Sequence, residues 1–232
     1  MNSVCAWLLL GRRRPRRFLL LRFRMATLQE PLRSTAMQRA MSEFPDGKCR
    51  CPWLPEGRPL YTQYHDEEWG VPSHDPLHLF EMICLEGMQA GLSWWTVLQK
   101  REHYRKVFHH FDPVKVAEMT DAQLEKLVLD PGIIRHRGKI EAVRANAKAW
   151  LALREREGDA VRWLWSFAGG KPRINSPQGM GDIAAKTPES DAMSKALRKA
   201  GFNFVGSTTL HAFMQATGMV NDHTVDCFRH GK

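Results

Sequence analysis

The chain has 232 residues and a formal net charge of +9, with an apolar content that is ordinary for a globular protein. This length is sufficient for one large domain with a substantial core. The charge does not indicate a basic DNA-binding surface, because residues 1–41 contain nine Arg and one Glu and carry nearly all of it. The rest of the chain is close to neutral, so a nucleic-acid surface there must be a local patch.

The Arg-rich segment over residues 1–45 is not typical of a folded domain. Its apolar run is interrupted by Arg22, is too short to cross a bilayer and has no clear secretory cleavage site. Two interpretations remain: an organellar presequence, or an over-extended start that precedes the true first Met. We expect a disordered or non-native leader, followed by a single domain over residues 46–232 and no membrane association.

The chain has five cysteines, an odd number with irregular spacing: Cys5, Cys49, Cys51, Cys84 and Cys227. This pattern argues against a disulfide framework. It favours a reducing compartment, which we take to be the cytoplasm, with some thiols free to bind metal.

Helical patterns dominate the chain after a Pro- and Gly-rich segment at 49–62, which we predict to be a loop. Asp75 is a natural N-cap for a helix that begins at Pro76. Further helices are predicted over residues 94–108, 113–118, 121–128, 135–155, 161–167, 190–199 and 208–217. Ser190 or Asp191 is expected to cap the helix at 190–199. Because no segment alternates with the period of a strand, the predicted class is all-α.

Aromatic residues and one carboxylate suggest a pocket for a flat ring. Tyr64 and Trp69 flank His65, and Glu86 lies near the end of an apolar helix that runs into Gly91-Leu92-Ser93-Trp94. Aromatic rings can sandwich a nucleobase while a carboxylate accepts hydrogen bonds from its edge. The alternatives are that the aromatic residues pack the core and that Glu86 forms a surface ion pair.

A metal site is suggested by His223 and Cys227, which are four residues apart and share a face on a helix or turn. Cys51 and His65 can supply the other two ligands of a tetrahedral zinc ion, although Cys49 competes with Cys51 for that role. Four protein ligands would make the site closed and structural, joining the two ends of the domain. An incidental His-x3-Cys pair near the terminus is the alternative.

The last two predicted helices are joined by a short segment from Gly201 to Gly206, with Lys199 beside it. Such a helical hairpin exposes backbone N–H groups near a helix N-terminus, which suits a DNA phosphate. An ordinary tight connection is the alternative. Two charged runs, Asp66–Glu68 and Arg135–Lys139, are expected to be solvated.

Taken together, these motifs closely resemble the bacterial 3-methyladenine DNA glycosylase I family over about three quarters of the chain. The matching segments are residues 64–72, 79–87, 89–94, 132–140, 201–206 and 221–223. The resemblance implies the all-helical fold of the helix-hairpin-helix DNA glycosylases and one structural Zn²⁺ per chain, held by Cys51, His65, His223 and Cys227. It selects Cys51 over Cys49 because the family's cysteine is followed two residues later by Trp, here Trp53.

The resemblance further implies a monomeric DNA repair enzyme that excises 3-methyladenine from alkylated double-stranded DNA. The base would be flipped out and its N-glycosidic bond hydrolysed, leaving an abasic site without a lyase step. Roles then pass to individual residues of this sequence. Glu86 and Tyr64 would be the catalytic contacts to the base, Trp69 and Trp94 would stack on it, Leu92 would fill the gap in the duplex, and Gly201, Gly206 and Lys199 would contact DNA.

Two other classes of protein remain open. A non-catalytic DNA-binding module stapled by zinc would use the same hairpin, but it has no reason to gather Tyr64, Trp69, Glu86 and Trp94 around one cavity. A zinc hydrolase needs an open coordination position and a carboxylate near the metal. Four protein ligands on the metal would exclude it.

Overall fold

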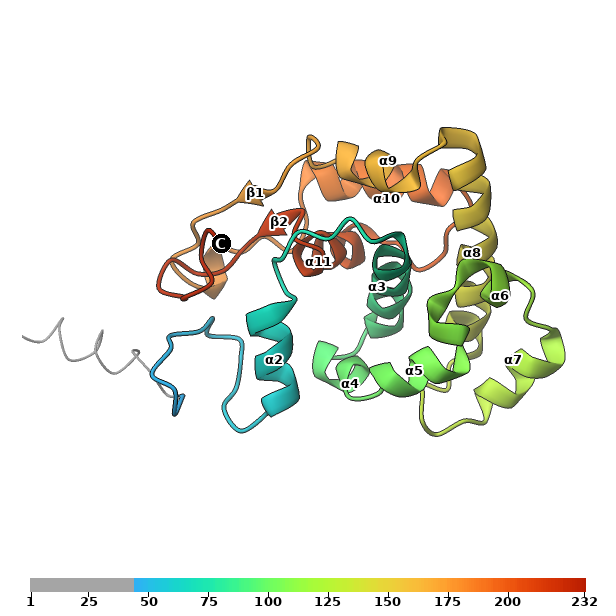
Figure 1. The fold of residues 1–232 in the computed structure, drawn as a ribbon, viewed down its shortest axis with the longest axis horizontal. Coiled ribbons are helices and arrows are strands. Elements are labelled where there is room, and N and C mark those ends of the chain that lie inside the picture. The colour runs from blue at the N-terminus through green and yellow to red at the C-terminus, as the bar shows by residue number, and fades with distance from the viewer. Residues whose placement is uncertain (1–43) are drawn as a thin grey trace, which may run out of the picture. The chain divides into compact units, whose positions relative to one another are not determined.

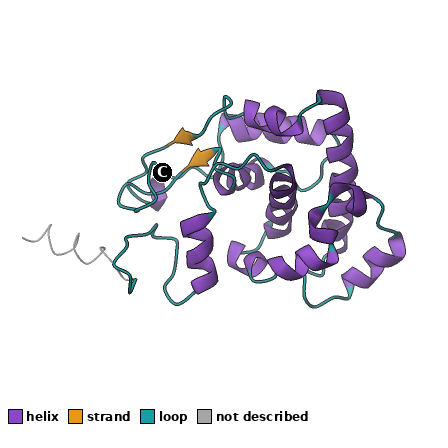
Figure 2. Ribbon diagram, viewed as in Figure 1, coloured by secondary structure: helices purple, strands orange, loops and turns teal. Residues whose placement is uncertain are grey.

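A computed structural model describes residues 44–232, so nearly all of the predicted leader lies outside the described residues (Figure 1). The described part is mostly helical, as the sequence predicts (Figure 2). Its helices are α2 (Pro59–Glu67), α3 (Pro76–Gln89), α4 (Trp94–Leu98), α5 (Arg101–Val107), α6 (Pro113–Ala117), α7 (Asp121–Val128), α8 (Arg137–Glu157), α9 (Ala160–Ser166), α10 (Pro188–Lys199) and α11 (Ser207–Ala216), with 3-10 turns η1 (His109–Phe111) and η2 (Met180–Asp182). None of these helices has the length and apolarity needed to cross a membrane.

One small element departs from the predicted all-α class. Strands β1 (Arg173–Ile174) and β2 (Val220–Asn221) pair in parallel, with Arg173 opposite Val220. Two residues are too few to produce a readable alternation, so no periodicity argument detects such a strand. This pairing holds the segment around residues 173–174 beside the C-terminal segment, which contains His223.

Two helix boundaries differ from the sequence prediction. The predicted loop at 49–62 ends early, because Pro59 is the first residue of α2 and not a loop residue. Proline is well suited to that position, since its missing N–H would be unpaired there anyway. The single helix predicted at 94–108 is two helices, α4 and α5. Between them the Lys100 N–H bonds to the Val97 carbonyl, three residues earlier, at 2.9 Å, which is the pattern of a tight turn.

Side-chain caps define where several helices begin. Asp75 accepts a hydrogen bond from the Leu77 N–H at 3.0 Å and caps α3 as predicted. The cap of α10 is Thr187, not Ser190 or Asp191. Thr187 and Ser190 bond reciprocally to each other's backbone N–H, and Pro188 takes the first helical position, so the helix starts two residues earlier than predicted.

Helix α3 lies at the centre of the described fold and contacts α4, α8, α9 and α11 (Figure 1). Ten consecutive residues of α3, Leu79 to Met88, are buried. Phe80 of α3 packs against Trp150 of α8, with ring centroids 5.6 Å apart. A helix that is buried on all sides is held rigidly, so the residues of its last turn are placed by the core itself.

Candidate active site and metal centre

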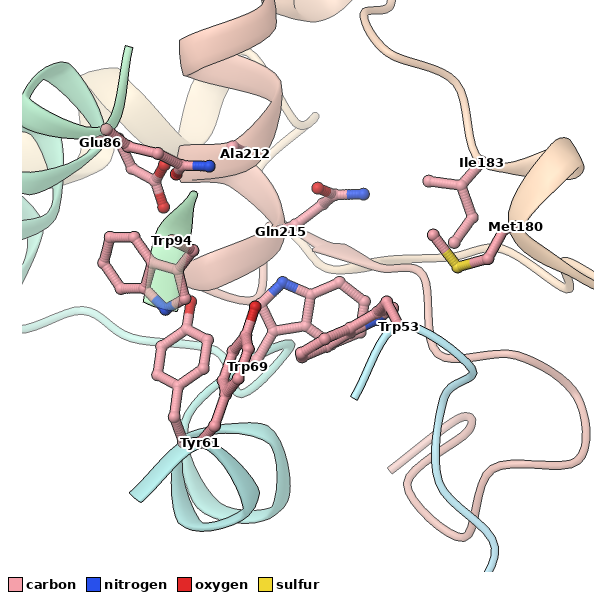
Figure 3. A pocket seen from close by; sticks show the side chains of 11 residues that line it. Trp53, Tyr61, Trp69, Glu86, Trp94, Met180, Ile183, Ala212 and Gln215 are labelled. Atoms are coloured by element: carbon pink, nitrogen blue, oxygen red, sulfur yellow. The ribbon is translucent and has the colours of Figure 1, made fainter. Parts of the chain in front are cut away.

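A cavity of about 180 Å³ opens beside the C-terminal end of α3. It lies between α2, α4, α11 and the segment that includes η2. Its lining residues are Trp53, Tyr61, Tyr64, Trp69, Glu86, Gln89, Trp94, Met180, Ile183, Ala212 and Gln215. The structure thus brings Tyr64, Trp69, Glu86 and Trp94, which the sequence singled out, around one pocket. In Figure 3, aromatic side chains occupy one side of this pocket, and Glu86 and Gln215 occupy the other.

Local structure aims these side chains at the pocket. Glu86 comes from the last turn of α3, after which the chain turns at Gly91, whose φ of +78° suits glycine. The Ser93 hydroxyl then accepts a hydrogen bond from the Thr96 N–H at 3.2 Å and starts α4. Trp94 is therefore the first residue of a helix, held eight positions beyond Glu86.

Glu86 is buried, and none of the described residues forms an ion pair with it. The residue is 4% exposed, and within residues 44–232 its Oε2 atom has no hydrogen-bond partner. Burial raises the pKa of Glu86 to about 8, against the opposing charge of Arg101. The carboxyl is therefore mainly protonated at neutral pH, and it is not the surface ion pair that the sequence allowed. An unsatisfied buried carboxyl costs free energy that a suitable ligand can recover.

The aromatic side chains of the pocket are fixed by contacts with each other. The Tyr64 ring lies 5.2 Å from the Trp94 ring, and Trp53 meets Trp69 edge-on at 5.0 Å. Burial, reinforced by the Glu86 charge, raises the pKa of the Tyr64 hydroxyl, which stays a neutral hydrogen-bond donor. Trp94 Nε1 is also buried and, in the described part of the chain, has no hydrogen-bond acceptor.

Several residues of the pocket were missed at the level of sequence. Tyr61 precedes Tyr64 by three positions and Gln89 follows Glu86 by three, so each shares a helix face with a predicted residue. That spacing was a usable signal, at least for Gln89. Trp53 stands in an irregular segment, and Gln215 lies far along the chain in α11. No local pattern connects either of them to Glu86.

Cys51, His65, His223 and Cys227 form a buried cluster whose ligand atoms all lie within 4.8 Å of one another. The Cys51 Sγ to His223 Nδ1 distance is 3.3 Å, and Cys227 Sγ lies 3.4 Å from the same nitrogen and 3.5 Å from His65 Nε2. A tetrahedral zinc ion requires sulfur–nitrogen separations of ~3.5 Å, given bonds of ~2.3 Å to sulfur and ~2.0 Å to nitrogen. The four residues therefore fit a metal ion, and they join the two ends of the described chain.

Each histidine of this cluster is oriented through its second ring nitrogen. His65 Nδ1 lies 2.8 Å from the Asp66 carboxylate, which Arg50 holds with a 2.6 Å contact. His223 Nε2 lies 3.0 Å from the Trp69 carbonyl oxygen. Such supporting bonds fix the orientation of metal-binding imidazoles. Asp66 is therefore a structural partner of His65 in the candidate metal site, which corrects its assignment to a solvated run.

Two further groups expected in solvent are engaged by the fold. Glu68 contacts Arg101 at 2.6 Å, and Arg101 also bonds Glu81 of α3 at 2.8 Å. This ion-pair network ties the segment just after α2, which includes Trp69, to α3. Lys139 is 7% exposed and donates to two carbonyl oxygens, so only part of the 135–139 run is solvated.

The proposed DNA-contacting residues lie on two turns. Gly201 has a φ of +94° and Gly206 is the N-cap of α11, so both shape the hairpin between α10 and α11. Lys199, the last residue of α10, is exposed. Leu92 is 42% exposed and lines a second cavity with Thr208 and Thr209 of α11. An apolar side chain at this point is exposed to solvent, next to the aromatic pocket.

Known proteins are similar to this chain in sequence and in fold. A family model described as methyladenine glycosylase matches residues 53–230. DNA-3-methyladenine glycosylase 1 of Escherichia coli K12 is 55% identical over 178 residues, which cover 77% of this chain and 95% of that protein.

Solved structures agree with these sequence matches. A crystal structure of 3-methyladenine DNA glycosylase I superposes with a TM-score of 0.76 at 54% identity, covering 78% of this chain and 99% of that one. A structure from Staphylococcus aureus, solved to explain 3-methyladenine recognition by the same enzyme, gives a TM-score of 0.75 at 35% identity, with 83% and 98% covered. The family model and these relatives match nearly the whole described chain, which therefore belongs to the DNA-3-methyladenine glycosylase I family.

Proposed function

We propose that the protein is a monofunctional DNA glycosylase that excises 3-methyladenine from alkylated double-stranded DNA. The observation that carries this proposal is Glu86, a buried carboxyl without a partner in the described chain, set in an aromatic pocket. A flat, cationic base with N–H groups on its edge satisfies both features of that pocket. The family relationship points to the same substrate.

Discrimination against normal adenine follows from charge. The 3-methyladenine base is cationic while it is attached to the sugar, and adenine is neutral. Giving up the Glu86 proton costs only ~1.4 kcal/mol at neutral pH, because its pKa is about 8. The resulting carboxylate attracts the cation strongly inside the pocket. Neutral adenine has no net charge for the carboxylate to attract, so nothing offsets the cost of deprotonating Glu86. Stacking of the cationic ring on Trp94 or Trp69 contributes a further ~0.5–2 kcal/mol.

The base reaches the pocket by leaving the DNA stack. Unstacking costs a few kcal/mol and is least costly for a damaged base. Leu92, exposed beside the pocket, fills the gap in the duplex, and the hairpin from Gly201 to Gly206, with Lys199, contacts the phosphates.

The chemical step is hydrolysis of the bond between the base and C1′ of the sugar. Water supplies the oxygen of the new C1′–OH group and releases one proton to solvent, and the base departs with the bonding electrons as a neutral molecule. Because the attached base is already cationic, it needs no prior protonation to leave. No described lysine lines the pocket, so an amine nucleophile for a lyase step is not placed there. The product is an abasic site.

Zinc is the metal that suits the cluster of Cys51, His65, His223 and Cys227, and its role is structural. A hydrogen bond from the Cys51 thiol lowers the pKa of Cys227, which favours the thiolate that metal ions bind. Four protein ligands leave no position for an activated water, which argues against a zinc hydrolase. We further propose a monomer that acts in the reducing cytoplasm, where such thiols persist.

Treatment of methylated duplex DNA with the purified protein tests the function. Chromatography of the released bases is expected to show 3-methyladenine with little 7-methylguanine, and the DNA is expected to gain abasic sites without strand cleavage. If the protein holds zinc and binds duplex DNA but releases no base, it is a binding module and the glycosylase proposal is wrong.

A further inference from the structure

Lys139 is a buried cation that supports the turn carrying Leu92. It stands in the first turn of α8, and its Nζ donates to the Met88 carbonyl oxygen at 2.8 Å and the Ala90 carbonyl oxygen at 2.6 Å. These carbonyls belong to the last turn of α3, where a cation is favoured by the helix dipole. The chain then passes through Gly91 to Leu92, so one ammonium group fixes the base of that turn.

Asn146 supports the hairpin from the same helix. Its side-chain amide donates to the Asn203 carbonyl at 3.1 Å and accepts from the Asn203 N–H at 2.8 Å. Asn146 is 2% exposed, so these bonds are shielded from water. They hold the middle of the segment between Gly201 and Gly206.

Lys139 and Asn146 lie on one face of α8. Seven residues are close to two helical turns, which places the two side chains about 10 Å apart along the helix axis. In Figure 1, the α10–α11 connection passes between α3 and α8. The two DNA-contacting turns are thus both fastened to one rigid element, α8.

The space between the two supports is filled. Phe204 of the hairpin packs against Gly87 of α3 so closely that a Cβ atom at Gly87 would lie 3.2 Å from the Phe204 Cβ. The residual cavity bounded by Gly87, Lys139, Asn146 and Phe204 has a volume of only about 10 Å³. In a well-packed junction of this kind, a shift of one segment displaces the other, because no empty space accommodates the movement.

We infer that this face of α8 sets the spacing between the two DNA-contacting turns, with Lys139 as a positioning residue for Leu92 and Asn146 for the hairpin. The inference rests on the proposed function and deepens it. Neither side chain lines the base pocket. Loss of either side chain should therefore impair binding to duplex DNA or excision from it, while leaving binding of the free base intact.

The test uses Lys139→Met and measures single-turnover excision from methylated duplex DNA alongside binding of free 3-methyladenine. Excision is expected to fall about tenfold or more, since hydrogen bonds to charged groups are the stronger ones. Binding of the free base should stay within about twofold, the range in which independent sites add. Lys100→Met is the matched control, because Lys100 also donates to a backbone carbonyl, that of Pro131, away from the pocket.

A double-mutant cycle separates positioning from mere stability. If Lys139 acts through Leu92, Lys139→Met should cost little more than about twofold when Leu92→Ala is already present. A full tenfold loss in both backgrounds, or an equal loss of free-base binding, would overturn the assignment of Lys139. A wild-type protein without excision, or Leu92→Ala without effect, would instead contradict the proposed function.

Asn146 has its own readout. Asn146→Leu removes both bonds to Asn203 and is expected to weaken affinity for undamaged duplex DNA several-fold, whereas Lys139→Met changes it by less than about twofold. Fluorescence anisotropy measures both. Unchanged duplex affinity for Asn146→Leu would refute the role assigned to Asn146. It would also refute the proposal that one face of α8 sets the spacing of the two turns.

Discussion

Glu86 and Trp94 line the same pocket, and each presents a buried polar atom that finds no protein partner among residues 44–232. Glu86 contributes an acceptor and Trp94 a donor, on opposite sides of the turn at Gly91. Folded proteins rarely leave two such atoms of one pocket unsatisfied unless a ligand completes them. The pair therefore identifies the part of the fold where stability is given up for binding.

The unfolding free energy should show this cost as a pH dependence. The pKa of Glu86 is raised to about 8 from an ordinary value of 4.5, so the folded state holds its proton while the unfolded state releases it. The wild type should therefore lose stability relative to Glu86→Gln as pH rises from about 4.5 to about 8. The loss should amount to a few kcal/mol, at ~1.4 kcal/mol for each pKa unit. Urea denaturation of both proteins with saturating zinc measures the difference.

Glu81, one helical turn earlier on α3, provides a control of opposite sign. Burial alone would raise the pKa of Glu81, but Arg105 and Arg101 hold it below its ordinary value. The wild type should therefore gain stability relative to Glu81→Gln as pH rises through the acidic range, and lose it as pH falls. If both variants show the same pH trend, the burial argument for Glu86 is wrong.

The support of His65 by Asp66 should appear in metal affinity. Asp66→Asn weakens the link from Arg50 to the His65 ring, and loss of such a partner typically lowers metal affinity by about 10–100-fold. Competition with a chromophoric zinc chelator measures the change. Asp191→Asn, which removes a surface carboxylate paired with Lys186, should leave the affinity at the wild-type value. Equal affinities for Asp66→Asn and the wild type would contradict the arrangement.

Leu92→Ala should separate function from stability. Leu92 is 42% exposed, so its truncation is expected to change the unfolding free energy by less than ~0.5 kcal/mol. Excision from duplex DNA should nevertheless fall strongly, because nothing fills the gap left by the flipped base. Leu129→Ala, at a residue that is 77% exposed, is the control and should retain full activity. A fully active Leu92→Ala protein would remove Leu92 from the mechanism.

Lys199 should account for one phosphate contact. Lys199→Ala is expected to weaken binding to any duplex sequence and to reduce the slope of log affinity against log salt by about 1. Lys126→Ala, an exposed substitution on α7, should leave the slope unchanged. An unaltered slope for Lys199→Ala would show that the hairpin contacts DNA without this side chain.

The sequence predicted those parts of the site in which the chemistry is close along the chain. Glu86 and Trp94 lie on either side of one turn, and Asp75 begins α3 through a side-chain bond to the Leu77 N–H. Local patterns are sufficient there, because the interactions that decide the structure are themselves local. The metal ligands are different: Cys51 and His223 are 172 positions apart, residue type alone left Cys49 as an alternative to Cys51, and the family resemblance chose between the two cysteines.

Contacts between distant segments explain the remaining errors. Asp66 looks solvated until Arg50 is placed beside it, and Lys139 looks like a surface cation until the end of α3 is packed over it. Gln215 enters the pocket from α11 only because α11 folds back on α3. A charged side chain has the same sequence signature in water as in a buried bond, so its environment is a property of the fold.

The central claim is that Glu86 recognises the methylated base in the act of excision. Single-turnover release of 3-methyladenine from methylated duplex DNA tests it most directly, with Glu86→Gln compared with Glu102→Gln, an exposed glutamate on α5. Replacing a charged partner of a hydrogen bond should slow Glu86→Gln by about tenfold or more, while Glu102→Gln keeps the wild-type rate. Equal rates for all three proteins would contradict the claim and return Glu86 to a structural role.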